Sequence, residues 1–244
     1  MIKKAILSFI FLCFLLYLNS EKISFSIDYL GLNVATVEMK YESINSQHNI
    51  TVAAKSSALI DLFTYSLDNT YVVRVDRNLK PIVYNKVIRQ KNFQETSITL
   101  YDFESQEARY FDSISQNSHV YKILDDTRDF FSALYYLRTL DLRENHIISI
   151  DVAGKIVLLE IRFLDTENIR TQIGNVTTNK IEISFKHFDN KRKFNSDMLT
   201  NNLWAEENKL YFWFTDDQRQ IPVRSHYIVK RMNVYWNIKK YDEK

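Results

Sequence analysis

Few residues in this 244-residue sequence have the types and spacing that catalysis or metal binding requires. The five histidines are His48, His119, His146, His187 and His226. No two of them have the HxH or HExxH spacing that brings two imidazoles to one metal ion. The single cysteine, Cys13, and only three glycines exclude a cysteine-rich zinc site, a glycine-rich phosphate loop and a GxSxG nucleophile motif. We therefore predict no catalytic residue, no metal site and no cofactor, and we expect that the protein is not an enzyme.

Asp216 and Asp217 form the one close carboxylate pair in a defined context. Such a pair can bind a divalent cation or share a proton, which would suit an enzyme acting on a cell-wall or lipid substrate. Aspartate is also common in turns, where its side chain accepts a hydrogen bond from the backbone two residues on. Arg219 can then pair across the hairpin, and Pro222 would mark a sheet edge or a bulge. The sequence favours the turn over the cation site.

The charge balance makes nucleic acid an improbable partner, because a nucleic-acid binder normally carries a strong basic excess. Lys and Arg together number 32, against 30 Asp and Glu, and the net charge is +2. Both excess charges belong to Lys3 and Lys4, so the chain after residue 20 has no net charge. We therefore expect recognition by that part of the chain to depend on shape and apolar surface.

Residues 1–20 have the parts of a secretory signal peptide. Two lysines form a positive start, residues 5–18 carry no charge, and the small residue Ser20 ends the segment. The apolar run is shorter than the roughly 20 residues that a membrane-spanning helix needs. Leu18 stands where a small residue is preferred, so an uncleaved N-terminal anchor is the alternative. In that case this segment would be the protein's only contact with a membrane.

Residues 21–244 are predicted to form a single antiparallel β domain, because no linker or repeat divides them and apolar residues alternate with polar ones. The expected strands are Ile23–Tyr29, Val34–Ile44, Ile50–Lys55, Asn69–Val75, Ile82–Gln90, Glu95–Tyr101, Ala108–Ser113, His119–Leu124, His146–Val152, Ile156–Phe163, Arg170–Val176, Lys180–Phe188, Leu210–Thr215, Ile221–Val229 and Met232–Ile238. So many strands favour a curved sheet or an incomplete β-barrel, because curling reduces the exposed sheet edge.

A single amphipathic helix is predicted over Phe130–Leu140 and is expected to pack against the curved sheet. Phe130, Leu134 and Leu137 recur at helical spacing, and Asp126 is the expected N-cap. These three apolar side chains would face a cavity inside the sheet, with Trp213 near its rim. They are the candidate contacts for an apolar ligand such as a lipid or acyl chain.

Three segments resemble an exported bacterial family, domain of unknown function 3108. The first contains Tyr29–Gly31 and Ala35–Met39, the second is Ser132–Arg138, and the third is Phe212–Arg224. Within them, the residues that match the family motifs are Ser132, Tyr136, Arg138, Asp216, Asp217, Arg219 and Pro222. The resemblance implies export to the periplasm or cell envelope and an antiparallel β architecture, but no reaction.

Two functions remain open at this point. A looser analogy to lipoprotein carriers of the LolA and LolB type, which bind acyl chains in a half-barrel, favours a non-enzymatic envelope protein that binds an apolar ligand. The alternative is an envelope scaffold or interaction module that binds a protein partner through a sheet edge or through the 216–219 hairpin.

Overall fold

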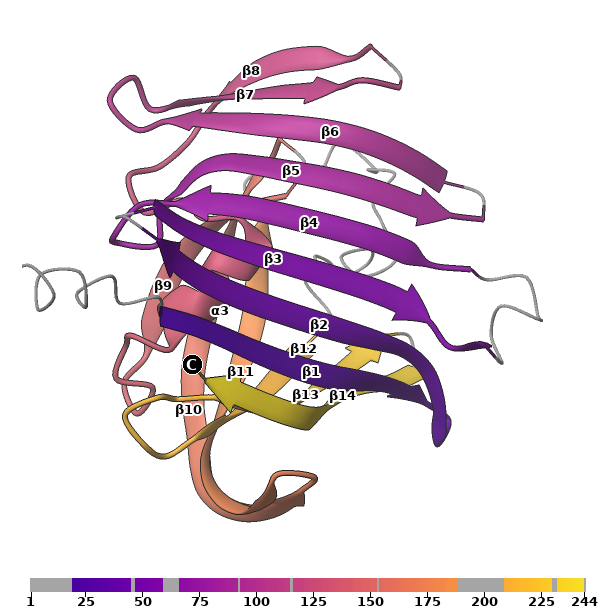
Figure 1. Cartoon of the computed structure of the whole chain (residues 1–244). Coiled ribbons are helices and arrows are strands. Elements are labelled where there is room, and N and C mark those ends of the chain that lie inside the picture. Colours follow the sequence, from indigo (N-terminus) through magenta and orange to yellow (C-terminus); the bar gives the residue numbers. More distant parts are fainter. Residues whose placement is uncertain are drawn as a thin grey trace, which may run out of the picture.

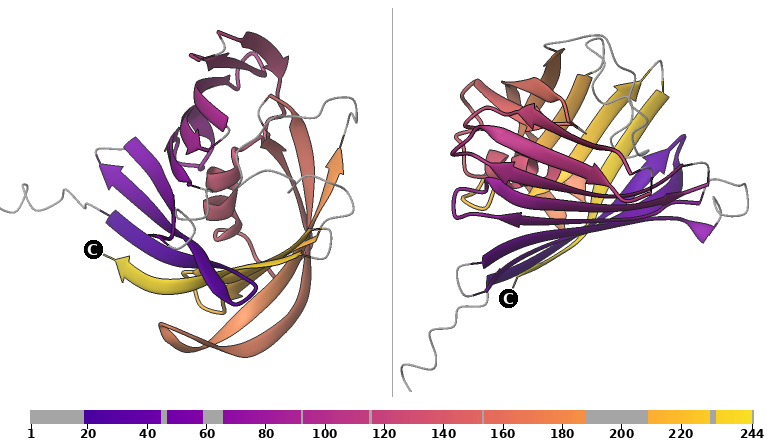
Figure 2. Two further views of the ribbon diagram at one scale, coloured as in Figure 1. Left: turned by 90° about the vertical axis from the view of Figure 1, so that its right-hand side faces the viewer. Right: turned by 90° about the horizontal axis from the view of Figure 1, so that it is seen from above.

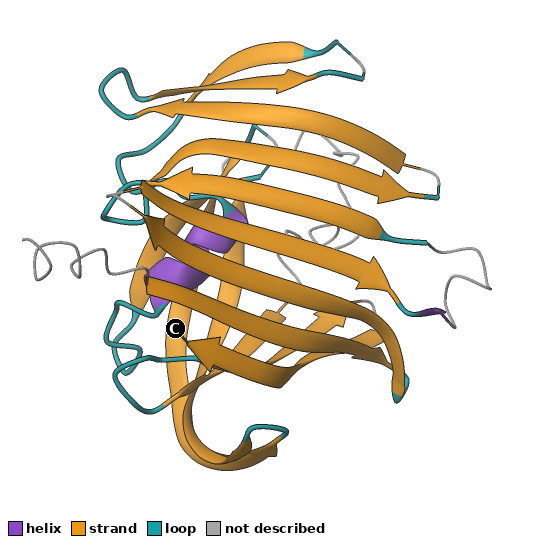
Figure 3. Ribbon diagram, viewed as in Figure 1, coloured by secondary structure: helices purple, strands orange, loops and turns teal. Residues whose placement is uncertain are grey.

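The alternation of apolar and polar residues produces a chain that is mostly β-strand, as Figure 3 shows. The computed structural model describes residues 19–44, 47–58, 66–91, 93–114, 116–152, 154–187, 209–229 and 232–243. Residues 1–18 of the predicted signal peptide lie outside the described residues, whereas Asn19 and Ser20 begin the first strand. No helix in this described part of the chain is long and apolar enough to span a membrane.

The described elements form one antiparallel sheet and the helix α3. They are β1 (Asn19–Tyr29), β2 (Leu32–Ile44), β3 (Gln47–Ser56), β4 (Asp68–Val75), β5 (Pro81–Gln90), β6 (Phe93–Asp102), β7 (Glu107–Asp112), β8 (Ser118–Lys122), α3 (Phe130–Leu137), β9 (His146–Asp151), β10 (Ile156–Thr171), β11 (Gly174–His187), β12 (Lys209–Thr215), β13 (Pro222–Val229) and β14 (Met232–Glu243).

The strand order follows the chain closely. It runs β8-β7-β6-β5-β4-β3-β2-β1-β14-β13-β12-β11-β10-β9, so the first and last strands pair in the middle of the sheet. The β1–β14 pairing is visible in Figure 1, where the indigo and yellow strands lie side by side. The sheet curls around α3, which connects its two edge strands, β8 and β9 (Figure 2).

The core lies on the concave face of the sheet, where alternate residues of each strand point inward. Val37 and Met39 of β2 and Ile50 and Val52 of β3 are almost fully buried. The helix packs on the same face, where its Phe131 ring lies 4.8 Å from the Tyr71 ring of β4, measured between centroids. Aromatic pairs at this separation and tilt contribute to stability beyond the area that they bury.

The helix begins at Phe130 as predicted, but its N-cap lies three residues after the predicted one. Asp129, not Asp126, caps α3, because its carboxylate accepts hydrogen bonds from the backbone N–H groups of Phe131 (2.9 Å) and Ser132 (3.2 Å). Asp126 instead accepts bonds from the backbone N–H and hydroxyl of Ser149 on β9. Sequence reasoning named the wrong aspartate because both precede the apolar stripe, and only the contact with β9 distinguishes them.

The helix also ends at Leu137, earlier than the predicted Leu140. After Leu137, backbone N–H groups donate to the carbonyl three residues earlier instead of four, from Thr139 to Tyr136 and from Leu140 to Leu137. A side chain from another part of the chain, Gln220, donates to the carbonyls of Arg138 and Leu140. This tertiary contact satisfies the carbonyls that a longer helix would leave free, and so stabilises the earlier end.

Strands β10 and β11 form one long hairpin (Figure 1), where the sequence predicted three separate strands. The predicted strand Arg170–Val176 is wrong, because the turn at residues 172–173 lies inside it. The register shifts between Phe163 and Asp165, which marks a bulge. A bulge resets the alternation of inward and outward residues, so a simple period-two pattern ends there although the strand continues.

The edge strands β8 and β9 are joined by side chains, since no backbone ladder pairs them among the described strands. The Asp151 carboxylate of β9 accepts hydrogen bonds from the Tyr101 hydroxyl of β6 (2.8 Å) and the Tyr121 hydroxyl of β8 (2.5 Å). The sheet is therefore an incomplete barrel with a seam that one buried carboxylate bridges. This confirms the predicted fold class, a curved antiparallel sheet with a helix against it.

Candidate functional site

The four candidate ligand contacts occupy packed positions. Leu134 and Leu137 are buried in the core, and Phe130 is half-buried against it. Trp213 is buried as well, and its indole N–H donates to the Glu167 carboxylate (2.5 Å). None of the four lines the three described pockets considered below. A ligand contact through these residues therefore stays a prediction.

The helical and hairpin motifs meet at the C-terminal end of α3. The Arg138 guanidinium donates from Nε to the Arg219 carbonyl (3.1 Å), and the Gln220 side chain donates to the Arg138 carbonyl (2.8 Å). Arg138 and Gln220 are 82 residues apart in the chain. This cross-contact fixes the end of the helix against the hairpin between β12 and β13.

Glu21 of β1 completes this arrangement, and sequence reasoning missed it. The Arg138 guanidinium binds the Glu21 carboxylate with both terminal nitrogens, at 2.5 and 2.6 Å, and each side chain is only 12% exposed. The Tyr241 hydroxyl of β14 donates to the same carboxylate (3.0 Å). One signal could have found Glu21, because the alternation of β1 places it on the same face as buried Ile23. A carboxylate at a core-facing position needs a cationic partner, because an unpaired buried charge is costly.

The Asp216–Asp217 pair does not act as a unit, because each carboxylate has its own partners. Asp216 accepts two bonds from the Arg143 guanidinium, at 2.8 and 2.9 Å, and one from Asn179. Asp217 accepts bonds from the Arg219 backbone and guanidinium. Burial raises the pKa of Asp217, but the bonds from Arg219 outweigh it and hold the pKa below its usual range. No cluster of three or more metal-ligating side chains occurs in the described part of the chain.

The remaining motif residues support the helix and the hairpin. The Ser132 hydroxyl donates to the Asp129 carboxylate, and the Arg128 guanidinium carbon lies 3.4 Å from the centre of the Tyr136 ring. Pro222 pairs with Phe214 beside a register shift in the β12–β13 ladder. A proline is tolerated at such an irregular position because it has no N–H to donate.

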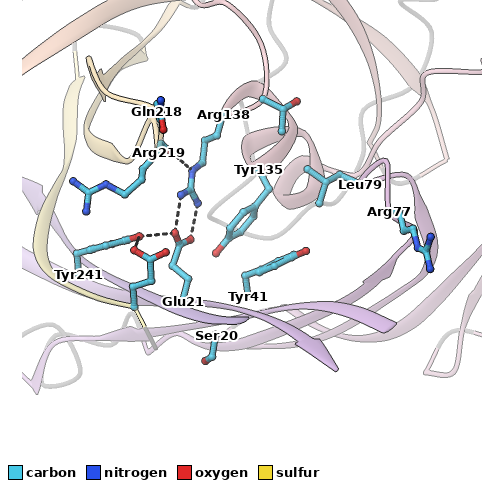
Figure 4. A pocket seen from close by; sticks show the side chains of 12 residues that line it. Ser20, Glu21, Tyr41, Arg77, Leu79, Tyr135, Arg138, Gln218, Arg219 and Tyr241 are labelled. Carbon is cyan, nitrogen blue, oxygen red and sulfur yellow. Dashed lines mark hydrogen bonds and ion pairs between the residues drawn. The ribbon is translucent and has the colours of Figure 1, made fainter. Parts of the chain in front are cut away.

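A pocket of about 400 Å³ opens beside the Arg138–Glu21 pair, and Figure 4 shows its lining. It lies between the end of α3, strands β1, β2 and β14, and the hairpin after β12, and we call it the α3 pocket. Its walls include Glu21, Tyr41, Tyr135, Arg138 and Tyr241. The Tyr41 and Tyr135 rings lie 5.4 Å apart between centroids, so they pack against each other in the wall of the cavity.

The Tyr135 hydroxyl is the unusual group in this pocket. The side chain is buried, yet its hydroxyl has no hydrogen-bond partner in the part of the chain that the structure describes. Burial, and then the negative charge of Glu21, raise the pKa of Tyr135, so the hydroxyl stays protonated and can donate a bond. Because neighbouring atoms cover the hydroxyl and it faces Glu21, it belongs to the packed end of α3, and the Tyr135 ring is the part of this residue that can meet a ligand.

Two further pockets contain polar groups that already pair with one another. In a pocket of about 330 Å³, Asp28 accepts bonds from Ser26, Asn33 and Asn237. A third pocket of about 460 Å³ lies against the Asp216–Asp217 turn, whose carboxylates bind arginines. The α3 pocket is therefore the better candidate for ligand binding.

A buried ion pair on β5 and β6 is another polar feature of the concave face. The Lys86 ammonium lies 2.6 Å from the Glu95 carboxylate, to which the Ser97 hydroxyl also donates (2.5 Å). Both charged side chains are buried. Because these groups satisfy one another, they stabilise the sheet and offer no open position for a ligand.

Comparison with solved structures supports the architecture. The chain is similar to a β-barrel-like protein of domain of unknown function DUF1849 from Brucella abortus, with a TM-score of 0.59 and 10% identity over 93% of this chain and 98% of that one. Lower TM-scores, 0.38 and 0.34, relate it to two further structures. One is described as an exported protein with a YmcC-like fold from Bacteroides fragilis (11% identity, 91% and 95% covered). The other is described as a lipoprotein from Parabacteroides distasonis (10% identity, 93% and 96% covered). The first likeness shows the shared fold, and the other two scores are too low to add to it.

A comparison with curated proteins gives no match. The model of the family "protein of unknown function (DUF3108)" matches residues 24–230. This range contains all three segments that resemble the family in the sequence, so that resemblance is confirmed. The chain belongs to the DUF3108 family of proteins of unknown function.

Proposed function

We propose that this protein is a non-catalytic, exported protein of the cell envelope that binds a ligand with an apolar part, such as a lipid, in the α3 pocket. The observation that carries the proposal is the α3 pocket itself, a cavity of about 400 Å³ whose walls combine Leu79 and two tyrosine rings with the Arg138–Glu21 pair. The signal-peptide features of residues 1–20 support export.

The pocket has suitable dimensions and walls for such a ligand. Its volume of about 400 Å³ falls within the range of roughly 300–1,000 Å³ that is usual for small-molecule sites. Leu79 and the rings of Tyr41 and Tyr135 supply apolar surface. The ligand's apolar part would contact these walls rather than Leu134 and Leu137, which the core already covers.

Native mass spectrometry of the protein purified from cells expressing the full chain tests the proposal. We expect a bound lipid in the wild-type protein and about tenfold weaker retention in Tyr41→Ala, because an aromatic wall worth roughly 1.5 kcal/mol of apolar contact is lost. Tyr235→Ala is the matched control, since it removes the same ring from Tyr235, which stacks on His226 away from the pocket. No bound lipid, or equal retention in both variants, would contradict the proposal.

A second candidate is a scaffold that binds an envelope protein through the β8 edge. This edge strand has β7 as its one ladder neighbour, and its outward-facing Val120 is 53% exposed beside exposed Leu100 and Phe111 on the same side of the sheet. The 216–219 hairpin is less suited, because its carboxylates already bind arginines of the chain. In-cell cross-linking of wild-type protein and Val120→Lys distinguishes this function: a partner lost only in the variant would support it, and an identical pattern would refute it.

A further inference from the structure

The turn between β1 and β2 contains a leucine in a backbone conformation that disfavours it. Two residues, Leu30 and Gly31, connect the strands, and both have positive φ, at 51° and 78°. A two-residue hairpin turn with positive φ at both positions favours asparagine, aspartate or glycine at the first of them, because a bulky side chain is strained there. The local conformation therefore gives no reason for a leucine at position 30.

Burial gives no reason for it either, as a comparison with a second leucine shows. Leu79, in the turn between β4 and β5, also has a positive φ (59°), but its side chain is half-buried against the core. Leu30 is 80% exposed, and Leu32 beside it is 54% exposed. Because neither conformation nor packing favours Leu30, its apolar side chain points to a contact outside the fold.

The residues around this turn suit contact with a lipid bilayer. The segment Tyr29–Leu32, which we call the β1–β2 tip, carries no charge. The nearest charge in the chain is Asp28, whose carboxylate accepts hydrogen bonds from the side chains of Ser26, Asn33 and Asn237. Tyr29 is half-buried at the base of the tip, and tyrosine favours the membrane–water interface because its ring is apolar and its hydroxyl polar. An apolar end above a paired polar base can enter the boundary of a bilayer with little loss of hydration.

The same side of the sheet presents a second apolar turn and a cation. Strands β1, β5 and β7 all end on this side, at the right in Figure 1. Ile114, in the turn after β7, is 55% exposed, and Lys91, directly after β5, is exposed as well. A pocket in a partner protein would accept one such tip, whereas a bilayer receives several projecting side chains and its anionic headgroups attract the lysine.

We propose that the β1–β2 tip inserts into the surface of a lipid bilayer, with Leu30 and Leu32 at the boundary between headgroups and acyl chains. This contact is separate from any that residues 1–20 make. It also lies at the opposite end of β1 from Glu21, which lines the α3 pocket. The tip and the pocket can therefore be changed one at a time, and the inference goes beyond the proposed function without resting on it.

A polarity-sensitive dye at the tip tests the insertion directly. Cys13 is the single cysteine, so Leu32→Cys in a Cys13→Ser background of the full chain carries one NBD group. We expect its emission to shift to the blue when vesicles of phosphatidylethanolamine and phosphatidylglycerol are added, because the dye leaves water. Leu124→Cys is the matched control, since Leu124 is 43% exposed and follows β8, which runs antiparallel to β7 and ends on the other side of the sheet. Its dye should not shift.

Leu30→Asn, added to the labelled protein, separates insertion from folding. At a fixed vesicle concentration it should lower the ratio of inserted to exposed dye about tenfold, because most of one leucine side chain loses its apolar contact. Asparagine suits the turn, so the thermal unfolding temperature should equal or exceed that of the parent protein. Lipid retention by the α3 pocket should not change.

Three results would overturn the proposal. They are an unshifted dye at position 32, an equal shift at position 124, and a vesicle response that Leu30→Asn leaves unchanged. If the dye does not shift but in-cell cross-linking to an envelope protein is lost in Leu30→Asn, the tip binds a protein and the bilayer is refuted. A failure of lipid retention in the native mass spectrometry above would concern the α3 pocket alone and leave the tip unaffected.

Discussion

The free energy of unfolding of this protein should depend on pH through Asp129, and a substitution of this residue can isolate its contribution. Its side chain is 0% exposed and caps α3, and burial raises its pKa from 3.8 to about 6, although bonds from Ser132 and Phe131 oppose the shift. The folded state therefore binds a proton more tightly than the unfolded state. The contribution of this group to stability is complete below about pH 4 and is lost as the pH rises through about 6.

The magnitude follows from the shift. Each pKa unit is worth about 1.4 kcal/mol, so raising the pKa of Asp129 from 3.8 to about 6 corresponds to about 3 kcal/mol at full ionisation. Part of this is already lost at pH 4, where the unfolded aspartate is half ionised. Between pH 4 and pH 7, ionisation of Asp129 should therefore lower the free energy of unfolding by roughly 2–3 kcal/mol.

Asp129→Asn removes the charge and keeps an oxygen that can cap the helix. Urea unfolding of wild type and variant between pH 4 and pH 7 should show the variant gaining roughly 2–3 kcal/mol over wild type toward pH 7. Other shifted carboxyl groups, such as Asp151 and Glu182, are common to both proteins and cancel in the difference. Asp129→Ala is a control that also lacks the charge but loses about 0.5–2 kcal/mol of capping at every pH. A wild-type-to-Asn difference that stays constant across this range would refute the reasoning.

Three further substitutions have definite expected outcomes. Asp151→Ala leaves the hydroxyls of buried Tyr101 and half-buried Tyr121 without their acceptor, so we expect a loss of roughly 2–4 kcal/mol and faster hydrogen exchange in β8 and β9; unchanged exchange would contradict the bridging role. Gly154→Ala should destabilise more than Gly31→Ala in thermal unfolding, because both have positive φ (+88° and +78°) but only the first places a Cβ 2.2 Å from a histidine ring; equal losses would contradict this. Lys86→Met leaves the Glu95 carboxylate buried without its cation and should lower the free energy of unfolding in urea by about 3–5 kcal/mol. A loss below about 1 kcal/mol is the value of a surface ion pair and would contradict the burial of this one.

Much of the fold can be predicted from the sequence, because each strand has one buried face and so carries its own alternation. The predicted strand Asn69–Val75 differs from the observed β4 by one residue at its start. The prediction fails where a local irregularity interrupts the pattern, as at the Phe163–Asp165 bulge in β10. It also fails at the N-cap and at the C-terminal end of α3, where Ser149 binds the predicted cap Asp126 and Gln220 binds the last carbonyls.

The candidate site could be predicted only in part. The family motifs pointed to Arg138 and Arg219, and the structure brings these two residues into contact. Glu21 and Tyr135 were missed for different reasons. The Glu21 carboxylate reaches Arg138 across 117 residues of chain, which local patterns do not encode, and Tyr135 resembles any other core aromatic until its hydroxyl is found without a partner in the described structure.

The order of strands in the sheet has a consequence for how the chain folds. Every ladder joins strands that follow one another in the chain, except the ladder between β1 and β14. The ladders β1 to β8 and β9 to β14 can therefore each assemble from successive hairpins, although 21 residues separate the end of β11 from the start of β12. Joining them requires contacts such as Tyr241 with Glu21, which are 220 residues apart, and closing so long a loop is entropically slow.

The last strand thus has to form before the first strand gains its second neighbour. Until then β1 exposes an unpaired edge, and the Glu21 carboxylate lacks the Tyr241 hydroxyl that it accepts in the folded protein. We expect the docking of the two halves to be the rate-limiting step of folding, with an intermediate whose open β1 edge makes it prone to association. The same pairing that places both ends of the domain at the centre of its sheet therefore delays its completion until the whole domain has been synthesised.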